Sequence, residues 1–391
     1  LEKLLVRTGS DTYADPEYWL SASFYRPGNK GANATTKVRH WKVSDLKRVG
    51  NVRYSKFTTV MQGGFDGLNI FNADRLAMNN ASIIREMTDA SQFGKDDSSS
   101  AAYRKAVDIM GSKSDVDIKL LAIPGIRHPV ITDFAITAVE NRFDAMYIMD
   151  IEERDTVNTV VTSSIQNIDV TNTVTSFLNR GLDTSFAAAY FPDVVITDPV
   201  TNSNVQCPPS VAVLGAFSLN DSVSHPWFAP AGFTRGALNT VLESQVKLKR
   251  ANLDALYEAD INPITSFPHT PGVVVFGQKT LQAAQSALDR VNVRRLLIDI
   301  RRKVKKIAQG LLFEPNRVDT LARFSNLVNP VMQQIQAQQG LDRYKVQIDT
   351  STTTQADVEN NTIRGKIFLQ PTRSLEFISL DFVVTNQGAE I

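Results

Sequence analysis

The periodicity of hydrophobic and polar residues changes along the chain, and these changes divide the chain into three regions. Residues 1–62 contain short alternating segments rich in aromatic and β-branched residues, and we predict strands at 18–25 and 38–43. From residue 74 onward, short apolar runs take turns with amphipathic segments of helical period. Such alternation is typical of a mostly parallel sheet that helices cover on both faces. The pattern predicts an α/β protein, α+β overall, with part of a β-rich outer domain at residues 1–62.

The middle region, residues 63–260, opens with Gly63-Gly64-Phe65-Asp66-Gly67. This cluster predicts a domain junction rather than a phosphate-binding loop, because no Lys-Ser or Lys-Thr pair follows it. We predict helices at 100–110, 130–143, 174–180, 209–217 and 252–258, and strands at 118–123, 145–150, 187–190 and 194–197. The proline-containing stretch 218–262 is predicted to be mostly connective.

The C-terminal region, residues 261–391, begins with a predicted buried strand at 272–277. The strongest amphipathic pattern in the chain follows and predicts a helix over 293–312. Its apolar stripe consists of Leu297, Ile300, Val304, Ile307 and Leu311, at spacings of three and four residues. A second helix is predicted at 319–338, followed by strands at 344–349, 362–369 and 375–385. We predict that residues 261–391 form a separate α+β domain.

The composition is that of an ordinary globular protein, with 42% hydrophobic and 21% charged residues. The net charge of +1 provides no global field that would attract nucleic acid or a membrane surface. The single cysteine, Cys207, excludes an internal disulfide, and the four histidines are scattered without metal-binding spacing. No apolar run approaches the roughly 20 residues that span a bilayer. We therefore predict no cofactor, no metal, no nucleic-acid partner and no membrane insertion.

The α/β pattern raises the question of catalysis, but the motifs are missing. Neither G-x-G-x-x-G nor G-x-S-x-G occurs, and His128 and His225 stand in proline-containing segments without an identifiable nucleophile. Cys207 is interpreted as an incidental thiol. The acidic run 150–155 follows a predicted core strand, where Mg²⁺ or Ca²⁺ sites occur, but we favour a solvated loop. The chain is predicted not to be an enzyme, and an α/β hydrolase is the remote alternative.

The predicted helix at 293–312 is strongly basic, and only Asp299 opposes its cations. The cations are Arg294, Arg295, Arg301, Arg302, Lys303, Lys305 and Lys306. Because stacking aromatics are not interleaved with them, an acidic protein partner fits better than nucleic acid, and a plain solvated helix face is the other interpretation. Our candidate contact residues are Arg294, Arg301, Arg302 and Lys305.

The last predicted strand offers a different kind of contact, pairing of backbone groups. It lacks proline and alternates imperfectly, so it can complete its own sheet or add to the open edge of a neighbour's sheet. The candidate residues are Leu375, Phe377, Ile378, Leu380, Phe382 and Val384.

Several segments resemble contractile tail sheath proteins of myovirus-type bacteriophages. They are Leu256 to Ile264 leading into Gly272 to Leu281, Asn292 to Leu296, Pro226 to Gly232 with Arg235-Gly236, and Gly63 to Gly67. The order and spacing of these segments over roughly residues 63–385 are specific to that family. The resemblance implies a subtilisin-like α/β core without a catalytic triad and a C-terminal domain that faces an inner tail tube. It also implies that subunits exchange an N-terminal arm and a C-terminal strand. No N-terminal arm is recognisable, so we expect a fragment that lacks it.

The function implied by the resemblance is mechanical. Subunits would polymerise as stacked rings around the tail tube, as a helical homo-oligomer, and contract to drive the tube through the host envelope for genome ejection. The expected partners are other copies of the chain, the tail tube protein, and the baseplate and tail terminator proteins. The expected location is the virion tail sheath, assembled in the host cytoplasm. A sheath of a related machine, a bacteriocin or a type VI secretion system, is the alternative.

Overall fold

A computed structural model describes residues 78–88, 98–162, 167–268, 272–349, 351–374 and 376, together with the backbone of three short strands nearer the N-terminus. The chain divides into two compact units, Leu1–Leu76 and Ala77–Ile391. In the first unit, β1 (Leu4–Val6), β2 (Ala22–Tyr25) and β3 (Val38–His40) form an antiparallel sheet in the order β1-β2-β3. The two strands predicted in this region are therefore confirmed over part of their length. The Gly63–Gly67 cluster lies outside the described residues.

The centre of the second unit is a six-stranded sheet in the order β4-β5-β6-β11-β12-β9. Its strands are β4 (Leu120–Ala122), β5 (Met146–Asp150), β6 (Ala187–Phe191), β11 (Ile261–Ser266), β12 (Val273–Val275) and β9 (Ala237–Leu238). The first four run parallel, and β12 and β9 are antiparallel additions. The predicted parallel core sheet is thus confirmed, with an antiparallel extension at one end.

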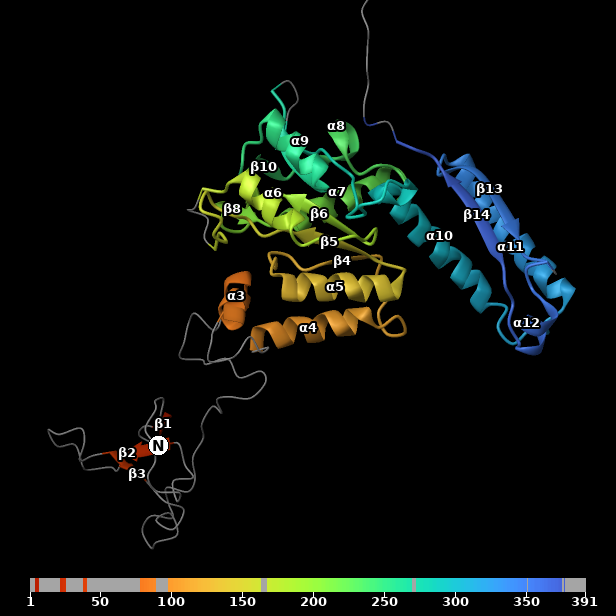
Figure 1. Cartoon of the computed structure of the whole chain (residues 1–391), viewed down its shortest axis with the longest axis horizontal. Helices are drawn as coiled ribbons and strands as arrows, with labels where there is room; N and C mark the ends of the chain where they lie inside the picture. The colour runs from red at the N-terminus through yellow and green to blue at the C-terminus, as the bar shows by residue number, and fades with distance from the viewer. Residues whose placement is uncertain are drawn as a thin grey trace, which may run out of the picture. The chain divides into compact units, whose positions relative to one another are not determined.

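Helices cover both faces of this sheet, as Figure 1 shows. On one face lie α5 (Pro129–Arg142), α6 (Val170–Leu178) and α9 (Arg250–Glu258), and on the other lies α7 (Pro209–Val223). The helix α4 (Ser98–Gly111) packs against α5, α3 (Asn80–Thr88) against α4, and the short α8 (Gly232–Arg235) against β12. Successive residues of β5 explain the layering: Tyr147 and Met149 pack in the cluster of α5, α6 and α9, whereas Met146 and Ile148 pack in the cluster of α7. Every residue of β5 and β6 is buried, which is why both strands read as continuous apolar runs.

Two predictions for the middle region need correction. The stretch 218–262 is less connective than expected, because it contains β9 and β10 (Val241–Ser244), and β10 pairs with β7 (Val194–Thr197) beside β8 (Asn204–Cys207). The boundary after residue 260 is also displaced. Since β11 pairs with β6 in the middle of the core sheet and β12 pairs with β11, the core continues at least through Val275.

A C-terminal module follows the core. It consists of α10 (Val291–Gln309), preceded by the short 3-10 helix η3 (Ala287–Asp289), then α11 (Val318–Ala337), α12 (Gln355–Glu359), β13 (Leu341–Gln347) and β14 (Lys366–Pro371). A hydrophobic cluster joins α10, α11 and the sheet, with Leu296, Ile300, Val328 and Met332 at its centre. Trp227 belongs to this cluster, and its indole Nε1 donates a 3.0 Å hydrogen bond to the carbonyl of Gln338.

The helix α10 connects the two parts of the unit. Val291 and Ile298, in its first half, pack into the core cluster with α7, whereas Val304 and Ile307 pack only against the C-terminal module. Both helices predicted in this region, and the strands at 344–349 and 362–369, are confirmed with shifted ends. The helix α10 is therefore shared between core and module.

Candidate assembly surfaces

The groups considered for catalysis have structural roles in the part of the chain that is described. The Nδ1 atom of His128 accepts a 3.3 Å hydrogen bond from the Val130 amide and caps α5, and burial lowers its pKa. His225 stacks on Trp227 with ring centroids 4.7 Å apart. Cys207 ends β8, and burial raises the pKa of its thiol. None of these three side chains is held against a nucleophile or base that would activate it.

The acidic run after β5 is not a solvated loop throughout, and that interpretation is wrong for two of its residues. Asp150 is buried and accepts hydrogen bonds from the Gly125 amide at 2.9 Å and from the amide and hydroxyl of Ser210 at 2.8 Å. Glu153, also buried, pairs with Arg127 at 2.9 Å, and the same guanidinium contacts Asp193. These carboxylates fix loops at the carboxyl edge of the sheet.

In this cluster Arg127 is paired with two buried carboxylates, Glu153 and Asp193, so the three side chains carry a net negative charge when all are ionised. Burial, helped by repulsion from Asp193, raises the pKa of Glu153 to about 7 although Arg127 opposes the shift. Burial alone lowers the pKa of Arg127, but Glu153 and Asp193 outweigh it and raise the value above its ordinary range. Among the described residues no group of three or more His, Cys, Asp or Glu side chains is arranged to hold a metal ion.

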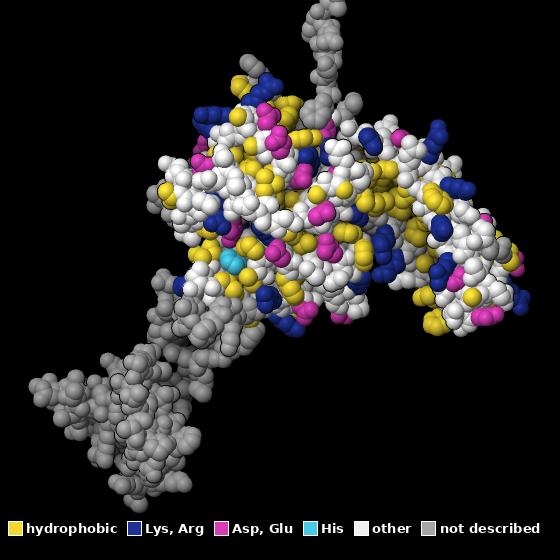
Figure 2. Space-filling model, viewed as in Figure 1, with side chains coloured by type: hydrophobic (Ala, Val, Ile, Leu, Met, Phe, Trp, Pro, Cys, Tyr) yellow, Lys and Arg dark blue, Asp and Glu magenta, His cyan; other side chains and the backbone are white. Residues whose placement is uncertain are grey.

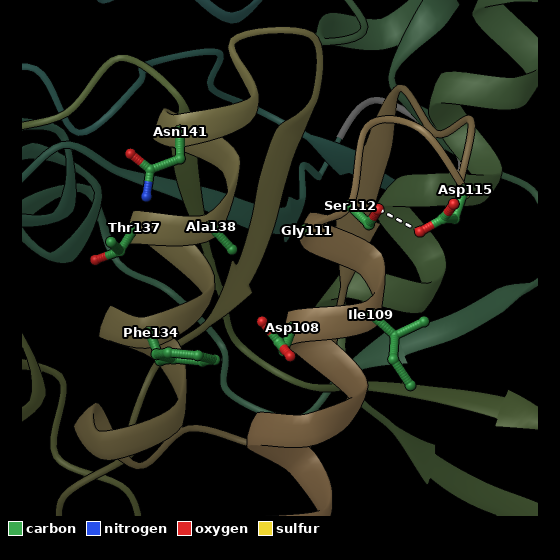
Figure 3. Close-up of a pocket in the computed structure, with 9 residues that line it drawn as sticks. All are labelled: Asp108, Ile109, Gly111, Ser112, Asp115, Phe134, Thr137, Ala138 and Asn141. Carbon is green, nitrogen blue, oxygen red and sulfur yellow. Dashed lines mark hydrogen bonds between the residues drawn. The ribbon is translucent and has the colours of Figure 1, made fainter.

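A hollow of about 540 Å³ lies between α4 and α5 (Figure 3). Its polar residues include Asp108 and Asp115, and the Ser112 hydroxyl donates a 2.6 Å hydrogen bond to Asp115. Phe134 and Ala138 of α5 line the opposite wall. The lining side chains provide carboxylates, hydroxyls and apolar surface, but no imidazole, thiol or amine that would form a nucleophile–base pair.

The basic residues of α10 fall into two groups by environment. In the first half, Arg294 is buried, lies with its Cζ 4.0 Å from the centroid of the Phe186 ring, and donates to the Ser185 carbonyl and hydroxyl. Burial lowers its pKa to about 10, so it stays protonated at neutral pH. Arg295 is buried as well and donates to both Asp221 oxygens at 2.6 Å. These two guanidinium groups act inside the chain.

Farther along α10 the cations reach solvent. Arg302 is half-buried and contacts Asp117 and the Ile118 carbonyl, so it still ties the helix to the core. Arg301 is exposed and lies over the Phe143 ring at 5.0 Å from its centroid, and Lys305 and Lys306 are exposed. Figure 2 shows Lys and Arg side chains gathered where α10 runs between the core and the C-terminal module.

Asp299 is the one carboxylate on this helix, and it is used twice. It pairs with Lys303 at 2.8 Å and with Lys119 of the core at 3.2 Å. Burial acts to raise its pKa, but these two ammonium groups prevail and lower it. Of the four candidate contact residues from the sequence, Arg301 and Lys305 lie on the exposed face, whereas Arg294 and Arg302 are engaged by the core.

The sheet β13-β14 is the second candidate surface. Its strands pair antiparallel from Leu341 opposite Pro371 to Gln347 opposite Lys366. Alternate residues Tyr344, Val346, Ile367 and Leu369 pack toward α10 and α11. Within the described part of the chain each strand has one partner only, so each presents one edge that is open for further pairing. The candidate strand residues Leu375, Phe377, Ile378, Leu380, Phe382 and Val384 lie outside the described residues.

Sequence reasoning missed an apolar corner between α10 and α11. Leu311 is buried there, whereas Leu312 and Val318 are 63% and 64% exposed and Phe313 is fully exposed. A signal was available: Leu312 and Phe313, between the helix-ending Gly310 and Pro315, have no place on the stripe of either helix. Leu312, Phe313 and Val318 therefore expose apolar side chains to solvent at this end of α10. No helix among the described residues has the length and apolar character needed to cross a membrane.

Comparison with solved structures places this architecture among contractile sheaths. The PVC sheath complex of an extracellular contractile injection system, in its contracted state, matches with a TM-score of 0.56 and 25% identity over 68% of this chain and 71% of that chain. The contracted helical sheath of the anti-feeding prophage matches with a TM-score of 0.55 and 23% identity, over 73% and 74% of the two chains. The fold is therefore that of contractile sheath proteins.

The sequence comparisons find similar proteins among bacteriophage tail sheath proteins. Residues 283–385, which include α10, α11, β13 and β14, match the family described as phage tail sheath C-terminal domain. The tail sheath protein of Vibrio phage KVP40 is 30% identical over 268 residues, 66% of this chain and 40% of the relative. That of Enterobacteria phage T4 is 32% identical over 193 residues, 49% of this chain and 29% of the relative. The resemblance to tail sheath proteins is thus confirmed, and the chain spans less than half the length of these relatives.

Proposed function

We propose that this chain is part of a subunit of a contractile bacteriophage tail sheath. The observation that carries the proposal is the agreement of two independent likenesses: tail sheath relatives by sequence and contracted sheaths by fold. The subunits stack as rings around the tail tube, as a helical homo-oligomer, and contraction drives the tube through the host envelope so that the genome is ejected. The tube, baseplate and tail terminator proteins are the proposed partners. The sheath assembles in the host cytoplasm and becomes part of the virion tail.

The proposal treats the α/β core as a structural body rather than an enzyme. Alternating parallel strands and helices support the subtilisin-like description, and the carboxylates at the sheet edge fix loops, as Asp150 does through Ser210. No cofactor, metal or nucleic acid takes part in the proposed mechanism. Rigid folded bodies suit a machine in which subunits move relative to one another while their connections persist.

Two surfaces of the C-terminal module provide the proposed connections. The exposed cations Arg301 and Lys305 contact acidic residues of the tail tube in the extended state. Such exposed ion pairs are each worth about 0–1 kcal/mol, so they separate together when the sheath contracts. The open edges of the β13-β14 sheet accept strands from neighbouring subunits, and the segment 375–385 is the strand that this chain contributes.

Electron microscopy of the complete protein that the gene encodes tests the proposal. The protein should form tubular polymers, and deletion of residues 377–391 should abolish them while the far-ultraviolet circular dichroism of the core is retained. A complete protein that stays monomeric in the presence of its tube protein, or a deletion variant that still polymerises, would contradict it.

A second candidate is a sheath of a related contractile injection machine, and the fold likeness to an extracellular contractile injection system favours its consideration. The genes beside this one separate the two: capsid and portal genes indicate a phage. Their absence beside a complete tail operon indicates an injection machine.

A further inference from the structure

A single carboxylate fastens the end of the described chain to the core. Arg290, at the N-terminus of α10, donates from Nε to Glu376 Oε1 at 2.7 Å and from Nη2 to Oε2 at 2.9 Å. Gln278, just after β12, donates a third hydrogen bond to Oε1 at 3.1 Å. A bidentate guanidinium–carboxylate pair fixes orientation as well as distance. Arg290 and Gln278 therefore both bind Glu376, although they precede it in the sequence by 86 and 98 positions.

The residues that hold Glu376 are themselves firmly placed. Gln278 is buried, and its carbonyl accepts a 2.8 Å hydrogen bond from the amide of Val291, the first residue of α10. Arg290 also contacts Asp289 at 3.4 Å and the Tyr257 hydroxyl at 3.3 Å, so its guanidinium is held from several sides. Buried Asn292 adds a 3.1 Å hydrogen bond to Ser374. Gln278 and Arg290 lie between named elements, but the Lys279–Arg290 bridge and the Gln278–Val291 hydrogen bond fix their backbones beside each other.

The pair is also shielded from water. The side chains of Arg290 and Glu376 are 24% and 19% exposed, whereas the surface pair Arg323–Glu314 of the same module is 60% and 42% exposed, with a 3.5 Å separation. Salt therefore screens the Arg290–Glu376 pair less than an ordinary surface pair. Two hollows, of about 280 and 560 Å³, lie on either side, and Glu376 lines both.

The position of this contact matters because of what lies on each side of it along the chain. On its N-terminal side the chain leads back to β14, whose only partner among the described residues is β13. One ladder of hydrogen bonds holds β14 to the sheet, so a pull on the end of β14 would open these bonds one after another, starting beside Pro371. On its C-terminal side the chain leads to the segment proposed above to pair with a neighbouring subunit.

We propose that Arg290, Gln278 and Glu376 form an anchor that transfers tension on the C-terminal segment to the core and so prevents β14 from peeling away from β13. This inference rests on the proposed function for the source of the tension, a second copy of the chain. The anchoring itself is a property of the isolated chain. Arg290 and Gln278 are positioning residues: they hold the point at which the segment leaves the core.

Hydrogen–deuterium exchange of the purified 391-residue chain tests the anchor directly. Glu376→Arg should raise the exchange rates of the amides of β14 and of Thr372, whose amide donates to the Gly340 carbonyl, at least tenfold and leave those of β5 and β6 unchanged. The double variant Arg290→Glu/Glu376→Arg should restore slow exchange, because the ion pair is re-formed with its charges exchanged. The control Glu314→Arg, which makes the same charge change at the exposed pair, should leave the exchange of β14 and Thr372 unchanged. Unaltered exchange in Glu376→Arg, or no recovery in the double variant, overturns the anchor.

Glu376→Gln provides a milder test if the charge reversal perturbs folding. It keeps the shape and one acceptor oxygen, so an intermediate rise in exchange is expected, and none at all would count against the anchor.

The assembled sheath tests the transfer of tension. In the complete protein, Glu376→Arg should give polymers that come apart at lower urea concentration than those of the parent and of Glu314→Arg. Parent protein that forms no polymer refutes the proposed function and leaves the exchange result standing. Parent and Glu376→Arg polymers of equal resistance refute the transfer of tension alone.

Discussion

The two halves of α10 carry the same kinds of residue in different surroundings. The first half is enclosed by core and module, so even Arg294 and Arg295 are buried and find their partners within the chain. The second half packs its apolar face on the module, contacts the core through Arg302, and exposes Arg301 and Lys305. A basic helix is therefore not one electrostatic surface. Arg294 and Arg295 hold the fold together, whereas Arg301 and Lys305 present their charges to solvent.

The largest expected difference between the halves concerns packing. Ile298→Ala should lower the free energy of unfolding by about 2–5 kcal/mol, because Ile298 is buried in the core cluster and its removal leaves a cavity. Ile307→Ala, the same change on the half-buried end, should cost about 1 kcal/mol, since solvent and neighbouring side chains can fill the space. Urea unfolding followed by circular dichroism measures both, and equal losses would contradict the comparison.

A second comparison concerns the buried cluster of the core, where the single cation Arg127 contacts two carboxylates, Glu153 and Asp193. With its pKa at about 7 in the folded chain, above its ordinary value of 4.5, Glu153 binds its proton more tightly folded than unfolded. Its stabilising contribution is complete below pH 4.5 and is lost as the pH rises through about 7. The parent should therefore lose stability relative to Glu153→Gln over this window, at most about 1.4 kcal/mol per pH unit.

Unfolding free energies of the parent and of Glu153→Gln at several pH values between 5 and 8 provide the measurement. Taking the difference between the two proteins removes the titration of all other groups. A difference that does not change with pH would show that Arg127 compensates both carboxylates.

The smallest effect on stability is expected for substitutions at the exposed end of α10. A substitution there should change binding to the tail tube without changing folding. Arg301→Glu/Lys305→Glu should change the free energy of unfolding by less than about 1 kcal/mol, because both side chains are exposed. The same variant should weaken binding of the complete protein to its tail tube, measured by co-sedimentation. The control Lys249→Glu/Arg250→Glu reverses two exposed charges beside and within α9 and should bind as the parent does. Equal binding of both variants would remove α10 from the proposed tube contact.

Much of the fold was predictable because local pattern and tertiary packing agree. The helix α10 follows from its apolar periodicity, and the strands β5 and β6 follow from their short continuous apolar runs. The strand β11 was missed because Asn262 and Pro263 interrupt its apolar pattern. In the structure Asn262 is buried and satisfied: its amide donates to the Ala189 and Lys279 carbonyls, and its oxygen accepts from the Lys279 amide. Because these partners lie 17 and 73 positions away, the local pattern of apolar residues does not reveal that Asn262 belongs to a buried strand.

The candidate surfaces were only partly predictable for a related reason. Sequence locates cations on a helix, but it does not tell which of them contact a distant element, as Arg294 contacts Ser185 and Arg302 contacts Asp117. The anchor at Glu376 is invisible for the same reason, because Gln278 and Arg290 are brought to it by the core. Conversely, Leu312 and Phe313 lie outside the apolar stripe of both neighbouring helices, so their exposure was predictable from the sequence.

The continuity of α10 has a mechanical consequence. Its 19 residues form one rod of about 28 Å, clasped by the core at one end and carrying the module at the other. Such a rod is a lever arm: a tilt of about 10° at the clasped end sweeps the far end through about 5 Å, the length of one helical turn. Small rotations of the core body are thereby amplified at the corner where Leu312 and Phe313 meet solvent.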